Sequence, residues 1–144
     1  MLTALSVLGY LGTVGALAAL AVRGELFSAA PAAIALQAGA FALLVWARVT
    51  FGRRSYHVAA NPTAGGLVTT GPYRYVRHPI YAAVTGFAWV GVAAHPSWPA
   101  IACGVLVLAS ALVRIHAEEA LVVAQYPEYA EYAARTWRML PYVF

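Results

Sequence analysis

Charge is scarce in this chain of 144 residues, and two charged residue types are missing altogether. It contains no lysine and no aspartate, and all charged residues together make up 10% of the sequence. Soluble domains average about 25% charged residues and 45–50% apolar residues, whereas 62% of this chain is hydrophobic. The composition therefore excludes an ordinary soluble enzyme and predicts an integral membrane protein.

Cysteine is equally scarce, because Cys103 is the only one, and no disulfide can form within the chain. It lies inside an apolar run, which predicts a small buried hydrophobic residue. The net charge of +4 comes entirely from arginines that are separated by apolar segments. Because these arginines form no continuous basic patch, we expect no nucleic-acid partner.

Apolar runs alternate with polar segments, at about residues 1–22, 26–47, 80–94 and 98–113. The first two are long enough to span a bilayer, and the last two are shorter, so flanking residues must contribute or the helices must cross obliquely. The sequence thus predicts a single all-α membrane-embedded domain with about four transmembrane helices. The last two helices would form a hairpin, and an amphipathic interfacial helix would follow at the C-terminus.

The first two runs carry no chemical motif, and the sequence assigns them no role in function. The first run lacks the basic start of a secretory signal peptide, so we expect it to stay in the protein. The second run is rich in alanine and contains Gly39, which predicts the close approach of a neighbouring helix.

Arginine is distributed unevenly between the loops. Five arginines fall in residues 48–79, three fall in residues 114–144, and none falls between the last two apolar runs. Arginine is retained on the cytoplasmic side of membranes. We therefore expect both termini, the loop 48–79 and the tail 114–144 in the cytoplasm, and the protein in the inner membrane of a bacterium.

Polar chemistry is concentrated in residues 71–81, which read Gly-Pro-Tyr-Arg-Tyr-Val-Arg-His-Pro-Ile-Tyr. An apolar run follows, so Pro79 falls where a helix would begin, a position at which its missing N–H costs nothing. The free N–H groups and the positive dipole end of that helix suit an anionic group. A basic loop that only fixes topology would show the same charge, but not this density of histidine, tyrosine and proline.

A second polar group occurs at residues 114–119, which read Arg-Ile-His-Ala-Glu-Glu. A helical hairpin would return these residues to the membrane face that carries His78. Arg114 and Glu118 are spaced i, i+4 and would share one face of a helix. The alternative is a plain surface ion pair at the membrane edge.

The remaining constellations are weaker. Tyr126, Tyr129 and Tyr132 recur at three-residue spacing, so this stripe would face either lipid headgroups or the site. No metal is expected, because metal-ligand spacing is missing among the four histidines, His57, His78, His95 and His116. Phosphate-binding and dinucleotide-binding loops and a nucleophile elbow are also missing from the sequence.

These residues resemble the superfamily of isoprenylcysteine carboxyl methyltransferases and phospholipid methyltransferases. The resemblance covers residues 70–141 and consists of Tyr73, then Arg77-His78-Pro79-Ile80-Tyr81, an apolar hairpin, Glu118-Glu119, Tyr129, Tyr132 and Leu140-Pro141. Either half alone would be weak, but the two coupled across a hairpin are fairly specific. The resemblance implies an integral membrane enzyme that binds S-adenosylmethionine on the cytosolic side without a soluble domain.

The resemblance also implies site residues. Its cofactor contacts fall on Thr70, Gly71, Pro72, Tyr73, His78, Pro79, Ile80, Tyr81 and Glu118, and the chemistry of the cofactor adds Arg77 for its carboxylate and Glu119 for its cationic groups. Arg114 matches the position that faces the substrate carboxylate in the carboxyl methyltransferases, so Arg114 and Glu118 are the candidate catalytic residues. Ala83 is a departure, since relatives usually place glycine there.

We therefore expect S-adenosylmethionine-dependent methyl transfer at the cytoplasmic membrane face, as in isoprenylcysteine carboxyl methyltransferases. Methyl transfer from a sulfonium needs positioning and desolvation more than an acid or a metal. The acceptor would be a lipophilic small molecule, a prenylated group or a lipid that enters from the membrane, and the sequence does not choose among them.

Two alternatives remain from the sequence. One is a phospholipid or other lipid N-, S- or O-methyltransferase. The other is a non-catalytic four-helix carrier or assembly protein. A carrier should show ionisable residues at mid-membrane depth, whereas Gln37 is the only strongly polar side chain within the apolar runs. This distribution favours an enzyme with its site at the membrane rim.

Overall fold

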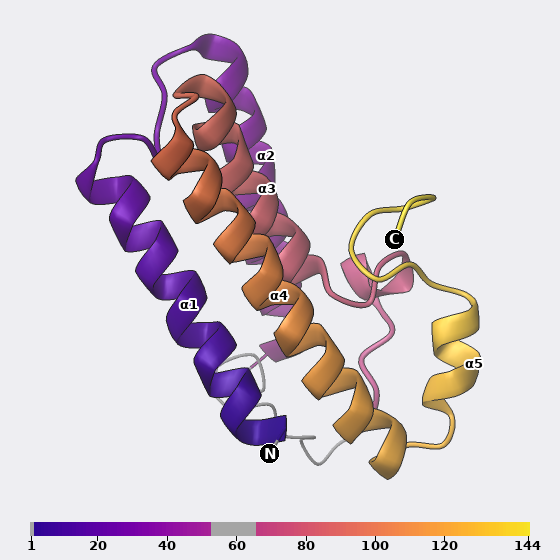
Figure 1. Ribbon diagram of the computed structural model, residues 1–144. Helices are drawn as coiled ribbons and strands as arrows, with labels where there is room; N and C mark the ends of the chain where they lie inside the picture. Colours follow the sequence, from indigo (N-terminus) through magenta and orange to yellow (C-terminus); the bar gives the residue numbers. More distant parts are fainter. Residues whose placement is uncertain (1, 53–65) are drawn as a thin grey trace.

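Helices make up most of the computed structural model, which describes residues 2–52 and 66–144 (Figure 1). They are α1 (Leu2–Val22), α2 (Pro31–Phe51), α3 (Pro79–Ala94), α4 (Trp98–Gln125) and α5 (Tyr129–Ala134), with a 3₁₀ turn, η2 (Gly71–Arg74), before α3. No strand occurs in these two ranges. The predicted all-α fold class is confirmed.

Length and composition separate α3 from the other long helices. Three of the described helices, α1, α2 and α4, are long and apolar enough to cross a membrane, whereas α3 has 16 residues. At about 1.5 Å per residue, α3 is shorter than the ~30 Å hydrocarbon core of a bilayer. A membrane-embedded helical bundle is therefore supported, and full spanning by α3 stays a prediction.

The helices begin where local sequence permits. Pro79 starts α3, as predicted, and Pro31 starts α2, because a helix's first N–H groups need no partner within the helix. The connection before α2 therefore runs through residues 23–30 and is longer than the short turn that the apolar pattern predicts. At the start of α4, Ser97 Oγ accepts a hydrogen bond from the N–H of Ala100 at 3.1 Å.

Helix α4 is longer than the apolar run that predicts it. The run ends at residue 113, but the helix continues to Gln125. Beyond residue 113, Arg114 and Ala117 are still buried on the face of α4 that packs inside the bundle. The polar residues that begin at Arg114 therefore do not end the helix. The tail helix is correspondingly short, since α5 has only six residues.

The helices pack against one another in pairs. Helix α1 lies along α4, α2 lies along α3, and α3 packs on α4 (Figure 1). Small and branched residues from three helices form the core, Ala16 and Leu20 of α1, Ala88 and Val92 of α3, and Ala100 and Val107 of α4. Cys103 packs against this cluster as a small hydrophobic residue, as predicted, and it is partly buried.

Close approach between helices occurs at glycines of α1. Helix α2 packs along α3, as the small residues of the second run predict, but the contact is not made at Gly39, where no described atom lies within 4 Å of the place a Cβ would take. A Cβ on Gly9 would lie 2.8 Å from Arg114 Cγ, and one on Gly12 would lie 2.5 Å from Ser110 Oγ. Helix α1 therefore rests directly on α4 at the level of Arg114.

Gln37, the polar residue inside the second apolar run, has a packing role. Its side chain is buried, and Nε2 donates to the carbonyl oxygen of Leu26 at 2.7 Å and to that of Phe87 at 3.4 Å. It thereby ties α2 to the preceding loop and to α3. This arrangement explains a polar side chain in an apolar helix without a transport function.

Candidate functional site

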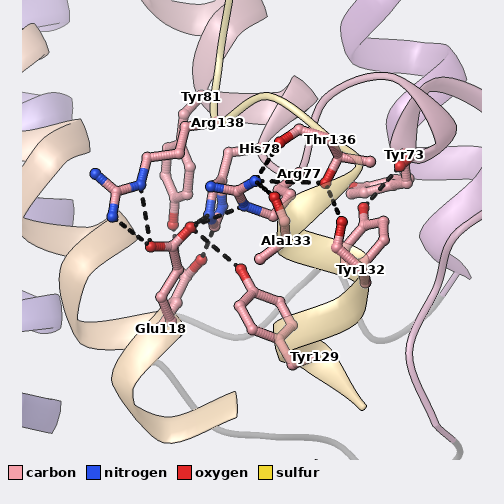
Figure 2. A network of polar contacts seen from close by, with 11 residues as sticks. Tyr73, Arg77, His78, Tyr81, Glu118, Tyr129, Tyr132, Ala133, Thr136 and Arg138 are labelled. Carbon is pink, nitrogen blue, oxygen red and sulfur yellow. Dashed lines mark hydrogen bonds and ion pairs between the residues drawn. The ribbon is translucent and has the colours of Figure 1, made fainter. Parts of the chain in front are cut away.

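The hairpin of α3 and α4 brings the two polar motifs together at one end of the bundle (Figure 2). His78 lies immediately before α3, and its Nδ1 is 3.9 Å from Glu118 Oε2 on α4. The hydroxyl of Tyr81, in the first turn of α3, donates a hydrogen bond to Glu118 Oε1. The convergence of His78 and Glu118 that the hairpin predicts is therefore present.

Three helices hold the guanidinium of Arg114. Its Nε donates to the Tyr81 hydroxyl at 2.7 Å, its Nη1 donates to the carbonyl oxygen of Ser6 at 3.0 Å, and its Nη2 lies 3.4 Å from Glu118 Oε1. The ring of Tyr10 lies 5.5 Å from the guanidinium carbon. Arg114 is buried, so the alternative of a plain surface ion pair is wrong.

Glu119 is the most heavily engaged carboxylate of the site. Its Oε1 accepts from Arg77 Nε at 3.1 Å and from the Tyr129 hydroxyl at 3.1 Å, and it bonds His78 Nε2 at 3.2 Å. Its Oε2 accepts from Arg138 Nε at 3.1 Å. Glu119 thus joins the loop before α3 to α4, α5 and the C-terminal segment.

The two neighbouring glutamates differ in how open they are. The Glu118 side chain is 26% exposed, against 14% for Glu119. Glu118 Oε1 is held by Tyr81 and Arg114, and Glu118 Oε2 has the His78 ring at 3.9 Å. Of the two carboxylates, Glu118 is the one that a ligand could reach.

Arg77 fixes the C-terminal segment to the loop before α3. Its Nη1 donates to the carbonyl oxygens of Ala133, at 2.8 Å, and Thr136. The backbones of the two segments also pair, with Arg77 N–H donating to the Trp137 carbonyl at 2.7 Å and His78 N–H donating to the Arg138 carbonyl at 2.9 Å. The sequence gives no sign of this pairing, because neither segment is a regular strand.

Two of the three tyrosines in the stripe, Tyr129 and Tyr132, face this network. Tyr129 and Tyr132 are buried, and the Tyr132 hydroxyl donates to the Tyr73 carbonyl at 2.7 Å. Burial raises the pKa of Tyr132 to about 12, and burial together with the charge of Glu119 raises the pKa of Tyr129. Both phenols stay protonated and donate hydrogen bonds within the protein, Tyr129 to Glu119 and Tyr132 to the Tyr73 carbonyl.

The end of helix α2 packs against the start of the motif at residues 71–81. Gly71 has φ of +57°, and a Cβ on it would lie 2.6 Å from Thr50 Oγ1, so both its conformation and its surroundings require glycine. Pro72 and Tyr73 are buried, and the Tyr73 ring lies 5.3 Å from that of Phe51. The other predicted contacts differ in exposure, with Thr70 exposed, Ile80 partly buried and Pro79 buried.

The other histidines lie apart from this network or outside the described residues. His95 caps the far end of α3 and hydrogen-bonds the Phe27 carbonyl at 2.8 Å. His116 is exposed on α4, and His57, with Arg53 and Arg54, falls outside the described residues. Within the part of the chain that the structure describes, no group of three or more histidine, cysteine or acidic residues could hold a metal ion.

These features define an integral membrane protein with a partly buried site of arginine, histidine and glutamate at one end of a helical bundle. A comparison with protein-family models matches residues 28–129 to the phospholipid methyltransferase family. The chain therefore belongs to this family of membrane methyltransferases. The match includes α2, the motif before α3, α3 and α4, and leaves α1 outside. No curated protein and no solved structure matches the chain.

Proposed function

We propose that this protein transfers a methyl group from S-adenosylmethionine to a lipophilic acceptor at the cytoplasmic face of the membrane. The observation that carries the proposal is the juxtaposition of Glu118, His78 and the first turn of α3 in a chain of a methyltransferase family. Glu118 is the open carboxylate of this group, and it stands beside a helix N-terminus.

The residues fit the charge pattern of the cofactor. S-adenosylmethionine carries a carboxylate, an amino group and a positively charged sulfur, and when bound it supplies an electrophilic methyl group. The N–H groups of Ile80 and Tyr81 have no acceptor within α3 and, with the His78 ring, would hold the carboxylate. Glu118 would hold the amino group, and the ring of Tyr81 offers an aromatic face for a cation.

The other predicted cofactor residues take supporting roles in this proposal. The residues at η2 would line one side of the cofactor site, because η2 leads directly into residues 75–81. These residues are Thr70, Gly71, Pro72 and Tyr73. Arg77 and Glu119 bind each other, and Glu119 also bonds His78. We therefore assign these two charged residues to positioning the His78 ring and the C-terminal segment.

Charge at the site favours an anionic acceptor. Three arginines pair with two glutamates at the site, so the net charge of these five side chains is +1, not counting His78. The arginines are Arg77, Arg114 and Arg138, and the glutamates are Glu118 and Glu119. The planar fork of Arg114 suits a carboxylate or phosphate. A lipophilic carboxylate, as in isoprenylcysteine-type acceptors, satisfies this charge. The second candidate is the amine of a phospholipid, which the description of the matched family favours.

Methyl transfer can be measured even while the acceptor is unidentified. Membranes containing the protein are incubated with methyl-tritiated S-adenosylmethionine, and radioactivity is counted in the organic extract. We expect labelled lipophilic product from the wild type and little from His78→Ala/Glu118→Ala. Added farnesylthioacetic acid and added phosphatidylethanolamine separate the two candidate acceptors. Equal labelling by wild type and double variant contradicts the proposed site.

Topology gives a separate prediction. Ala29 lies between α1 and α2, and Gln125 ends α4 at the site end of the bundle, and both are exposed. In a Cys103→Ala background, we expect Gln125→Cys to react with a membrane-impermeant maleimide only from the cytoplasmic side, and Ala29→Cys only from the other side. Labelling of both from the same side contradicts the proposed orientation.

A further inference from the structure

Helix α1 lies outside the family match, yet it contacts the site directly. The match begins at residue 28, whereas α1 ends at Val22. Along its length α1 packs against α4 (Figure 1). The contacts nearest the site are those with Arg114, and they come from three positions within about one and a half helical turns, Ser6, Gly9 and Tyr10.

Each of these positions acts on the arginine in a different way. The Ser6 carbonyl accepts from Arg114 Nη1 at 3.0 Å. Gly9 leaves the space that the arginine stem fills, because a Cβ there would lie 2.8 Å from Arg114 Cγ and 2.9 Å from the Ser110 carbonyl oxygen. The Tyr10 ring lies 5.5 Å from the guanidinium carbon, which is cation–π distance.

The contact from α1 fixes the orientation of the guanidinium. Tyr81 and Glu118 hold it from α3 and α4, and two anchors on one side would let its plane rotate about the line between them. The Ser6 carbonyl holds the guanidinium from the opposite side. Recognition of a carboxylate or phosphate by two parallel hydrogen bonds depends on that plane.

Tyr10 lies between the arginine and the exposed surface of α1. This residue is 40% exposed although its ring lies against a buried cation. A lipophilic acceptor that enters from the bilayer on this side of α1 would therefore meet the Tyr10 ring before it met Arg114.

We propose that α1 forms the membrane-side wall of the acceptor site, with Tyr10 contacting the acceptor and with Ser6 and Gly9 positioning Arg114. This inference rests on the proposed methyltransferase function and deepens it. Acceptor recognition then depends on a segment outside the family match, whereas cofactor binding depends on segments inside it.

Two glycine variants of the same helix test the positioning role. Gly9→Ala and Gly15→Ala both gain helix propensity, but no described atom lies within 4 Å of a Cβ at Gly15. We expect Gly9→Ala to reduce methyl transfer into the organic extract at least tenfold, with a change of less than threefold in the affinity for S-adenosylhomocysteine. Gly15→Ala should match the wild type in both measurements.

Tyr10 variants test the wall without disturbing helix packing. We expect Tyr10→Phe to keep the activity, because the aromatic face remains, and Tyr10→Leu to raise the KM for the active added acceptor about tenfold while cofactor affinity stays unchanged. Wild-type transfer and KM in both Gly9→Ala and Tyr10→Leu overturn the role of α1 and leave the proposed function standing. Absence of any methyl transfer by the wild type overturns the proposed function, and the inference with it.

Discussion

Replacing Glu118 by alanine is expected to weaken S-adenosylhomocysteine binding roughly ten- to a hundredfold, because a charge-assisted hydrogen bond is worth about 1.5–3 kcal/mol. His78→Ala should act similarly, since its ring lies beside the same carboxylate. Thermal unfolding without ligand should change little, because both side chains lie outside the apolar core. Calorimetric titration of the purified variants gives the affinities, and a melting curve of each checks the fold.

Matched controls exist for both substitutions. Glu131 is exposed on α5 and pairs with Arg135, one helical turn further on, and His116 is exposed on the same helix as Glu118. Glu131→Ala and His116→Ala should bind S-adenosylhomocysteine as the wild type does. If affinity survives both Glu118→Ala and His78→Ala, these residues are structural charges and the cofactor binds elsewhere.

Arg114→Lys is expected to keep cofactor affinity nearly intact and to lower methyl transfer by about a hundredfold, the size of loss that small misplacement of a reacting group causes. Lysine keeps the charge but has no planar fork, so it cannot hold a carboxylate or phosphate in two parallel hydrogen bonds. It also cannot reach Tyr81, Ser6 and Glu118 together, as the guanidinium does. Turnover with saturating cofactor and calorimetry on the same preparation provide the comparison.

A second substitution separates recognition of the acceptor from orientation of Glu118. Arg114 donates to Tyr81, and Tyr81 donates to Glu118, so the arginine could act through this chain of hydrogen bonds. In that case Arg114→Ala should damage cofactor affinity as much as Glu118→Ala does. Parallel loss of affinity and turnover in both arginine variants would remove Arg114 from the acceptor site.

The local sequence predicts the part of the site that depends only on regular helices and the hairpin between them. Pro79 marks the start of α3, and the apolar runs on either side of residues 95–97 require a hairpin. A hairpin of two helices returns the chain to its starting face, which places Glu118 near His78 whatever the side-chain details. The i, i+4 spacing of Arg114 and Glu118 likewise indicates one helix face, although the apolar pattern does not predict the length of α4 beyond residue 113.

The contacts that sequence cannot predict join irregular segments or distant helices. Arg77 binds carbonyl oxygens of residues 133 and 136, and backbone carbonyls carry no signature in the sequence. Ser6 holds Arg114 in the same way, through its carbonyl and not its side chain. Glycines mark close approach only once the neighbouring helix is known, which is why the sequence pattern points to Gly39 and not to Gly9.

The central claim is that the site at the end of the α3–α4 hairpin binds the methyl donor, and titration of the purified wild type with S-adenosylhomocysteine tests it most directly. We predict saturable binding with one site per chain, reduced at least tenfold by His78→Ala/Glu118→Ala and unchanged by Glu131→Ala/His116→Ala. The absence of binding by a folded wild type, or equal binding by all three proteins, would contradict it.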